Sequence, residues 1–411
     1  MKRSPFAPAV VPLLPAIDGV RLATVEAGIK YKNRSDLLLM LFDPGTTVGG
    51  VFTQSKTAGA PVEWCRSSLT GGKGRALVVN SGNSNAFTGS AGRKTVRDTA
   101  GVAAAIAGCA ISEVFIASTG VIGQPFDAHI ITRQLPGLAA TAQTDVWAAA
   151  AAAILTTDTH AKLATRTAMI DGATVTLNGI AKGSGMIAPD MATMLCFIAT
   201  DAAIAAPVLQ TLLRPAADKS FNAISVDGDT STSDTLLLFA TGTAISRGAG
   251  AVTDASDPRL ASFRTALEAL TLDLALQVVK DGEGLSKFVT ITISGAESDI
   301  SARRIGLAIA NSPLVKTAIA GNDPNWGRLV MAVGKSGEAA DRDRLAIRFG
   351  DIIVAEHGGA VSSYTETAGA EYFRRAEISI AVDVGVGNGR ATVYTCDLTA
   401  DYVAINADYR S

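Results

Sequence analysis

Histidine and paired cysteines are scarce in this chain of 411 residues, which has three histidines and four cysteines. The histidines stand far apart in the sequence, so the chain offers few residues for a zinc site or a histidine-based catalytic triad. No CxxC pair is present, which favours reduced, buried thiols in a cytoplasmic protein over a disulfide framework. The four cysteines are Cys65, Cys109, Cys196 and Cys396.

Charge of one sign and long apolar runs are also lacking. The net charge is -2, which gives no electrostatic reason to expect nucleic acid or an anionic membrane as a partner. The most apolar window, residues 147–155, is rich in alanine and too short to span a membrane. With 48% hydrophobic residues, the chain can build one large domain or two of medium size.

The N-terminus has the charge pattern of a secretion signal, with Lys2 and Arg3 before an apolar stretch that reaches Ile17. Prolines at positions 5, 8, 12 and 15 prevent a continuous helix there, and no convincing cleavage site follows. The stretch is therefore expected to be an extended arm.

Strand and helix patterns alternate without a regular repeat. In the first half, residues 37–42, 76–79 and 114–117 are short apolar runs typical of buried strands. Helices are expected over 94–107 and 260–279, where small and apolar residues follow a helical period. This mixture predicts an α+β fold.

The second half contains two strands with alternating apolar residues, at 289–294 and 378–384. The latter is followed by Asn388 and Gly389, a dipeptide typical of hairpin turns, and then by a return strand at 391–396. The glycines at 385–389 thus stand in a turn rather than at the start of a helix, which argues against a dinucleotide site.

Residues 227–234 (DGDTSTSD) suggest a calcium loop, but the sixth position is Thr232 and the twelfth is Leu238. A calcium loop needs glycine and glutamate at these two positions, so a polar hydrogen-bonded loop is favoured.

Residues 182–196 (KGSGMIAPDMATMLC) carry the most specific chemistry of the chain. Their glycines and proline exclude regular structure, and an apolar strand is expected over 194–199. Thr193 stands just before this strand. Cleavage of the Ala192–Thr193 bond would give Thr193 a free α-amine that can act as the base for its own hydroxyl. The alternative is a threonine that only packs beside a strand.

Two further groups of residues can serve a catalytic site. Thr119 and Gly120 follow a predicted strand, where a hydroxyl and exposed backbone N–H groups can form an oxyanion hole, although such clusters also form simple turns. Residues 280–284 (KDGEG) place two carboxylates in one loop, for which a solvated turn is the alternative.

Together these segments resemble the ornithine acetyltransferase family, also called the glutamate N-acetyltransferase family. The similarity runs almost from end to end in one order. It includes EAGIK at 26–30, GVFT at 50–53, VVNSGNSN at 78–85, STGVIG at 118–123, TTD at 156–158, residues 182–195, VDGDTST at 226–232, DGEG at 281–284, DPNWGR at 323–328, CDLT at 396–399 and INADYR at 405–410.

The resemblance implies a precursor that cuts itself between Ala192 and Thr193. Residues 1–192 would become an α chain and residues 193–411 a β chain, and the two would remain together in an α2β2 hetero-oligomer. The implied fold is the αββα sandwich shared with self-cleaving aminopeptidases.

The resemblance also implies the roles of single residues. Thr193 would be the nucleophile, with Thr119 and Gly120 as its oxyanion hole, and no metal or cofactor would be needed. Lys182 can pair with a carboxylate and Glu283 can hold an ammonium group. The implied substrate-binding residues are Thr156, Lys182, Thr193, Glu283, Asn406 and Ser411.

The implied activity is ping-pong transfer of an acetyl group from N2-acetyl-L-ornithine to L-glutamate through an acetyl-Thr193 enzyme, within cyclic arginine biosynthesis in the cytoplasm. The sequence leaves open whether acetyl-CoA is a second acetyl donor. Two residues depart from the common family pattern: Asp190, close to the cut, and Ser411, which keeps the usual hydroxyl. The alternatives are a self-cleaving aminopeptidase of the same fold and a non-catalytic amino-acid-binding protein.

Overall fold

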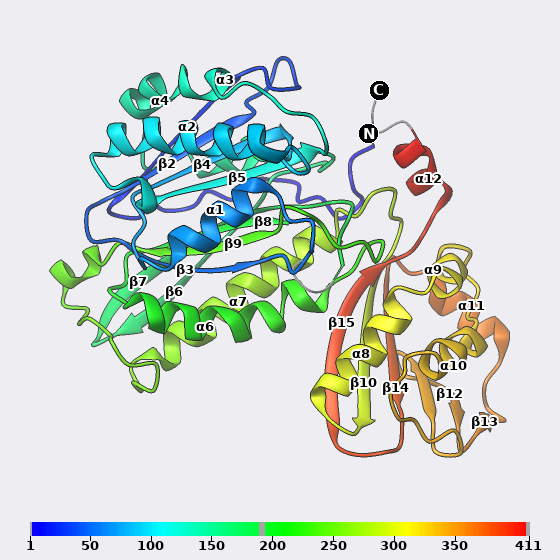
Figure 1. The fold of residues 1–411 in the computed structure, drawn as a ribbon. Helices are drawn as coiled ribbons and strands as arrows, with labels where there is room; N and C mark the ends of the chain where they lie inside the picture. The colour runs from blue at the N-terminus through cyan, green and yellow to red at the C-terminus, as the bar shows by residue number, and fades with distance from the viewer. Residues whose placement is uncertain (1, 189–193, 408–411) are drawn as a thin grey trace.

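Three β-sheets organise the chain (Figure 1). The structure is a computed structural model that describes residues 2–188 and 194–407. The sheet orders are β1-β2-β4-β5, β3-β9-β8-β7-β6 and β13-β12-β11-β14-β10-β15. Residues 2–16, which precede the first strand, form no helix, as expected for an extended arm.

The first sheet has helices on its outer face. Every residue of β2 is buried, because this all-apolar strand is covered on both faces. The strands are β1 (Val20–Val25), β2 (Leu37–Phe42), β4 (Ala76–Asn83) and β5 (Val114–Val121), and the covering helices are α2 (Gly89–Ala107), α3 (His129–Thr132) and α4 (Leu135–Thr141). Apolar side chains of these helices and of the sheet form one core.

The second sheet lies against the first, and two long helices cover its other face. Its strands are β3 (Thr47–Phe52), β6 (Lys162–Ile170), β7 (Ala173–Lys182), β8 (Leu195–Thr200) and β9 (Thr235–Ala240), and its helices are α6 (Ala206–Asp218) and α7 (Leu260–Val279). Helices α1 (Ala60–Leu69) and α5 (Trp147–Ala153) pack against strands at the margins of the two sheets.

A shared apolar core joins the two sheets face to face. In it, the rings of Phe42 and Phe239 stack with their centroids 4.1 Å apart, and Phe115 meets Phe239 edge-on. The layers therefore run helix, sheet, sheet, helix, and the predicted αββα sandwich within an α+β fold is confirmed.

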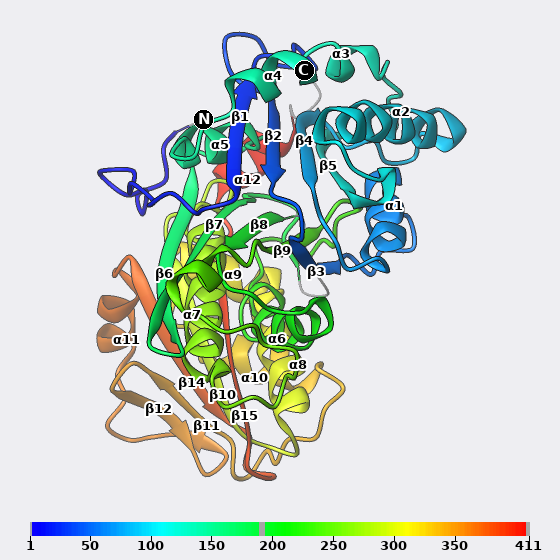
Figure 2. The ribbon, with the colours of Figure 1, turned by 90° about the vertical axis from the view of Figure 1, so that its left-hand side faces the viewer.

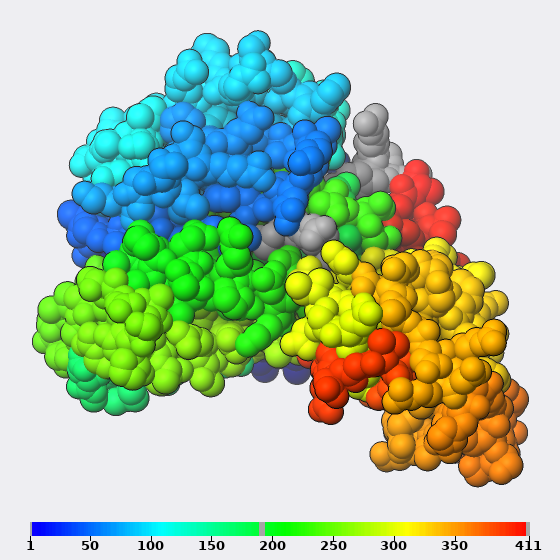
Figure 3. All heavy atoms as spheres, turned by 60° about the horizontal axis from the view of Figure 1, so that its bottom comes forward, coloured from blue at the N-terminus to red at the C-terminus, as the bar shows by residue number. Residues whose placement is uncertain are grey.

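The third sheet forms a separate unit beside the sandwich, with its own core (Figures 1 and 3). Figure 2 shows it below the two sandwich sheets. Its strands are β10 (Phe288–Ala296), β11 (Ala346–Phe349), β12 (Ile352–Glu356), β13 (Gly359–Ala360), β14 (Glu377–Asp383) and β15 (Gly389–Cys396). Its helices are α8 (Asp299–Ala310), α9 (Pro313–Ala320), α10 (Trp326–Gly334) and α11 (Glu366–Phe373).

The last described helix, α12 (Ala400–Ala407), lies next to the first residues of the chain (Figure 1). Short 3-10 turns at Ile111–Glu113, Phe221–Ala223 and Thr243–Arg247 complete the secondary structure of the described residues. No helix within these ranges is both long and apolar enough to pass through a bilayer.

Local patterns predicted some elements well and others poorly. The bounds of β2 and α7 match their predicted ranges, whereas β5 continues past the predicted end at residue 117, through Thr119 and Gly120. The predicted hairpin of β14 and β15 is wrong, because β10 lies between them, parallel to β14 and antiparallel to β15. A turn dipeptide reports only the local reversal of the chain, and the pairing depends on the intervening strand.

The segment that contains Ala192 and Thr193 connects two adjacent strands. β7 and β8 are antiparallel neighbours in which Lys182 is paired with Leu195. β8 also pairs with β9, so strands from both sides of residues 192 and 193 share one hydrogen-bonded sheet. Residues 189–193, with Asp190, Ala192 and Thr193, and residues 408–411, with Ser411, lie outside the described residues.

Candidate active site

A small cavity of about 100 Å³ gathers the predicted site residues. Every one of them that lies within the described ranges lines this cavity. They are Thr119, Gly120, Thr156, Lys182, Glu283 and Asn406. These residues come from β5, from the loop after α5, from the end of β7, from the loop after α7 and from α12. The fold thus brings together residues that are up to 287 positions apart.

The pair Thr119 and Gly120 lies at the end of β5, where this strand approaches β4 very closely. Gly120 has a φ of +129°, and a Cβ there would lie 2.3 Å from the carbonyl carbon of Gly82. Only glycine fits such a backbone. Thr119 is buried, and its hydroxyl accepts a hydrogen bond from Lys182 Nζ at 3.3 Å.

Lys182 is the buried cation of the cavity. Its ammonium group lies between the hydroxyl of Thr119 and the carboxylate of Asp158, with Nζ 4.0 Å from Asp158 Oδ2. Burial lowers the pKa of Lys182, and the charge of Asp158 opposes this effect. A cation that is only partly compensated by protein groups can bind a ligand carboxylate.

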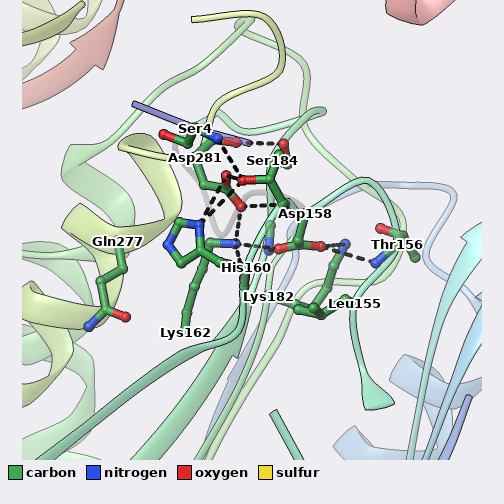
Figure 4. A network of polar contacts seen from close by, with 12 residues as sticks. Ser4, Leu155, Thr156, Asp158, His160, Lys162, Lys182, Ser184, Gln277 and Asp281 are labelled. Carbon is green, nitrogen blue, oxygen red and sulfur yellow. Dashed lines mark hydrogen bonds and ion pairs between the residues drawn. The ribbon is translucent and has the colours of Figure 1, made fainter. Parts of the chain in front are cut away.

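Asp158 is a buried carboxylate that sequence analysis did not single out as a site residue (Figure 4). Its Oδ1 accepts hydrogen bonds from Lys162 Nζ and from the backbone N–H of Gly183, both at 2.6 Å. Its Oδ2 accepts the backbone N–H of Thr156 at 3.1 Å. Asp158 thereby fixes two segments of the cavity wall.

Opposing effects set the pKa of Asp158. Burial alone would raise this pKa, but the charges of Lys162 and Lys182 and the accepted hydrogen bonds hold it below its ordinary value. Asp158 is therefore a carboxylate at neutral pH.

Asp281 forms the other half of the same network (Figure 4). Lys162 Nζ lies 2.6 Å from Asp281 Oδ2, which also accepts the backbone N–H of Thr159 at 2.8 Å. His160 Nδ1 lies 3.3 Å from Asp281 Oδ1. Burial would raise the pKa of Asp281, but the hydrogen bond with His160 and the charge of Lys162 keep it lowered.

Glu283 faces the cavity from the loop after α7. Its Oε2 accepts a hydrogen bond from Asn406 Nδ2 at 2.7 Å, and its backbone N–H donates to Ser184 O at 3.0 Å. Ser184 in turn donates its hydroxyl to the backbone oxygen of Asp281 at 2.6 Å. A Cβ at position 185 would lie 2.5 Å from the Glu283 carboxyl group, so Gly185 makes room for it.

The alternative of a solvated turn over residues 280–284 does not hold for its carboxylates. Asp281 and Glu283 are only 1% and 7% exposed. The turn is covered because α12 packs onto it at Gly284, where a Cβ would lie 2.4 Å from the backbone nitrogen of Tyr402. Gly284 has a φ of +68°, which favours glycine.

Asp234 is a further buried carboxyl group, located just before β9. Its Oδ1 accepts the backbone N–H of Met194 at 2.9 Å, and its Oδ2 has no hydrogen-bond partner within the described ranges. Burial raises the pKa of Asp234 well above its ordinary value, against the effect of the Met194 hydrogen bond.

The polar loop over residues 227–234 holds the backbone of residues 186 and 187 through Asp227. Asp227 Oδ2 and Oδ1 accept the backbone N–H groups of Met186 and Ile187 at 2.6 and 2.9 Å. No group of three metal-ligating side chains is found within residues 2–188 and 194–407.

Comparison with known proteins places the chain in a family. The ArgJ family model matches residues 21–411. The chain belongs to the ArgJ family. It is 60% identical over 408 residues to the arginine biosynthesis bifunctional protein ArgJ of Mesorhizobium japonicum and to that of Rhizobium meliloti, with 99% of each chain covered.

Two solved structures of named relatives are also similar. One is the arginine biosynthesis bifunctional protein ArgJ from Bacillus halodurans, with 37% identity, a TM-score of 0.48, and coverage of 50% of this chain and 95% of that chain. The other is ornithine acetyltransferase complexed with ornithine from Mycobacterium tuberculosis, with 32% identity, a TM-score of 0.39, and coverage of 44% and 94%.

Proposed function

We propose that this ArgJ family member transfers the acetyl group of N2-acetyl-L-ornithine to L-glutamate, with Thr193 as the nucleophile. The supporting observation is that all predicted site residues within the described ranges line one cavity. That cavity joins a buried cation, Lys182, to a carboxylate, Glu283. Opposite charges in the lining of one cavity suit a zwitterionic amino acid.

In the first half-reaction, the hydroxyl oxygen of Thr193 forms a bond to the acetyl carbon, and the amide C–N bond of acetylornithine breaks. The α-amine of Thr193 takes the hydroxyl proton and passes it to the leaving amine. Its ordinary pKa, about 7.7–8.0, suits a general base near neutral pH. Thr119 and Gly120 stabilise the oxyanion, a contribution of roughly 3–4 kcal/mol for each donor.

In the second half-reaction, the α-amine of glutamate attacks the acetyl-Thr193 ester. A C–N bond forms as the Thr193 α-amine takes a proton from the attacking glutamate nitrogen. The ester C–O bond then breaks, and the Thr193 α-amine passes this proton to the Thr193 oxygen. N-acetylglutamate leaves, and the cycle is ping-pong. The residues supply the nucleophile, the base and the oxyanion donors, so the proposed steps use no metal or bound cofactor. Acetyl-CoA is a candidate second donor for the same acetyl-enzyme.

Maturation by self-cleavage belongs to the same proposal. The Thr193 hydroxyl attacks the carbonyl group of Ala192, an N→O shift gives an ester, and water opens it. The α chain (1–192) and the β chain (193–411) then remain associated, because β7 and β8 are neighbours in one sheet and share apolar cores. We infer an α2β2 assembly in the cytoplasm, and Ser411 completes the substrate site.

Replacing the nucleophile tests the proposal most directly. Thr193→Ala should leave a single uncut chain and abolish ornithine release from acetylornithine, because both steps need the hydroxyl. Intact mass under denaturing conditions and an assay for released ornithine measure the two effects.

The matched control is Thr193→Ser, which keeps the hydroxyl and should still be cut. An uncut but fully active Thr193→Ala protein would disprove the nucleophile assignment. Acetate instead of N-acetylglutamate as the product, with glutamate present, would instead indicate a hydrolase.

A further inference from the structure

A second, larger cavity of about 620 Å³ lies next to the candidate active site. Two of its lining residues, Thr157 and Glu283, also line the small cavity. The two spaces therefore adjoin at Thr157 and Glu283. A cavity of about 100 Å³ is too small for an acetylated amino acid with a long side chain, so part of the substrate must extend beyond it.

The walls of the larger cavity carry charges of both signs. Lys2 and Arg3 of the N-terminal arm line it, and so does Asp401 in the first turn of α12. Glu283 adds a second carboxylate at the junction with the small cavity. The sequence places these groups almost 400 residues apart, and the fold brings the arm and α12 together (Figure 1).

The arm is fixed in this position by specific contacts. The backbone N–H of Ser4 donates to Thr159 Oγ1 at 3.0 Å, and Thr159 itself is held by Asp281 (Figure 4). The Ser4 hydroxyl donates to the backbone oxygen of Lys280, and the ring of Phe6 packs edge-on against Phe288. Lys2 and Arg3 are thus held within two residues of an anchored position.

The two amino acids of the proposed reaction differ most at the ends of their side chains. Ornithine ends in an ammonium group and glutamate in a carboxylate. Glu283 attracts the ammonium group of ornithine and repels the side-chain carboxylate of glutamate. Lys182 is assigned to the α-carboxylate, which both amino acids have. A ping-pong enzyme that binds both in one site needs a further cation for the glutamate side chain.

We propose that the larger cavity is the side-chain subsite for both substrates, with Lys2 and Arg3 selecting the acidic acceptor. Asp401 and Glu283 face the ornithine ammonium group in the same space. Arg3 donates one N–H to Pro8 O at 2.6 Å, which leaves four donors of its guanidinium group for a carboxylate. The inference rests on the proposed acetyl transfer.

The test separates the two half-reactions of the full-length, self-cleaved enzyme. Lys2→Ala/Arg3→Ala should raise the KM for glutamate roughly three- to tenfold, as expected for partly exposed charged contacts. Single-turnover release of ornithine from acetylornithine should change less than twofold, since neither lysine nor arginine attracts its ammonium group. The control Lys335→Ala/Arg342→Ala removes the same charge from the third-sheet unit and should leave both steps unchanged.

Charge reversal keeps the proposal testable if the double variant folds poorly. Arg3→Glu should raise the KM for glutamate more than Arg3→Ala does, while the KM for acetylornithine stays the same or falls. An unchanged KM for glutamate, or equal losses for both substrates, would overturn the subsite assignment alone. A wild-type enzyme that releases no ornithine from acetylornithine would overturn the proposed function and, with it, the subsite.

Discussion

Buried aspartates on the two sides of the small cavity have pKa values that are shifted in opposite directions. On the β6 side, Asp158 and Asp281 share the ammonium group of Lys162, and their pKa values are lowered. On the β9 side, Asp234 is equally buried, has one hydrogen bond to the Met194 backbone, and has a raised pKa. β7 and β8 separate the two sides in the sheet.

This difference teaches how partners decide the effect of burial on a carboxyl group. Cations and N–H donors that replace the lost water lower the pKa, whereas burial without them raises it. The paired side therefore holds Thr156 and Lys182 in place, whereas Asp234 has a raised pKa beside Met194, the residue that follows Thr193. Three predictions test the comparison.

The largest effect is expected from removing the shared cation. Lys162→Met leaves Asp158 and Asp281 buried without their common partner, which should lower the free energy of unfolding by about 3–5 kcal/mol. Chemical denaturation measures this loss. Lys219→Met, which breaks an exposed pair with Glu268 at 3.1 Å, is the control and should cost less than about 0.5 kcal/mol. Equal losses in the two variants would mean that the buried network adds no special stability.

A smaller effect with a defined pH dependence is expected from Asp158→Asn. Because the folded pKa of Asp158 is lowered, its stabilisation is present above the unfolded value of about 3.9 and is lost as pH falls below it. The variant should be roughly 2 kcal/mol less stable than the wild type at pH 7, and this difference in the free energy of unfolding should shrink steadily as pH falls from about 4 toward the lowered folded pKa. Unfolding midpoints across this range measure the difference. The exposed Asp343→Asn should show no such difference, and a difference that stays constant or grows as pH falls below about 4 would contradict a lowered pKa of Asp158.

The smallest effect, with the opposite slope, is expected from Asp234→Asn. The raised pKa of Asp234 means that its contribution is fully present below about pH 4 and is lost as pH rises toward the folded pKa. The amide can still accept the Met194 N–H, so the variant should lie within about 1 kcal/mol of the wild type at low pH. The stability of the variant relative to the wild type should rise as pH increases above about 4. A variant that loses stability over this range would show that Asp234 is a paired carboxylate.

Part of this protein follows from local sequence. The apolar runs of β2 and α7 have their predicted bounds, because burial on both faces or a helical period leaves a clear local pattern. The family segments also predict site roles for Thr119, Gly120, Lys182 and Glu283, which line one cavity, and these roles stay predictions. Thr193 stays a prediction, since it lies outside the described residues.

The tertiary structure alone decided which residues meet and in what state of charge. The pairing of β15 with β10, the burial of Asp281 and the placement of the N-terminal arm against α12 depend on contacts between distant segments. Asp158 and Asp234 have the same side chain in similarly polar segments. Lys162, Lys182 and backbone N–H donors next to Asp158 lower its pKa, whereas burial with one hydrogen bond from a described residue raises the pKa of Asp234.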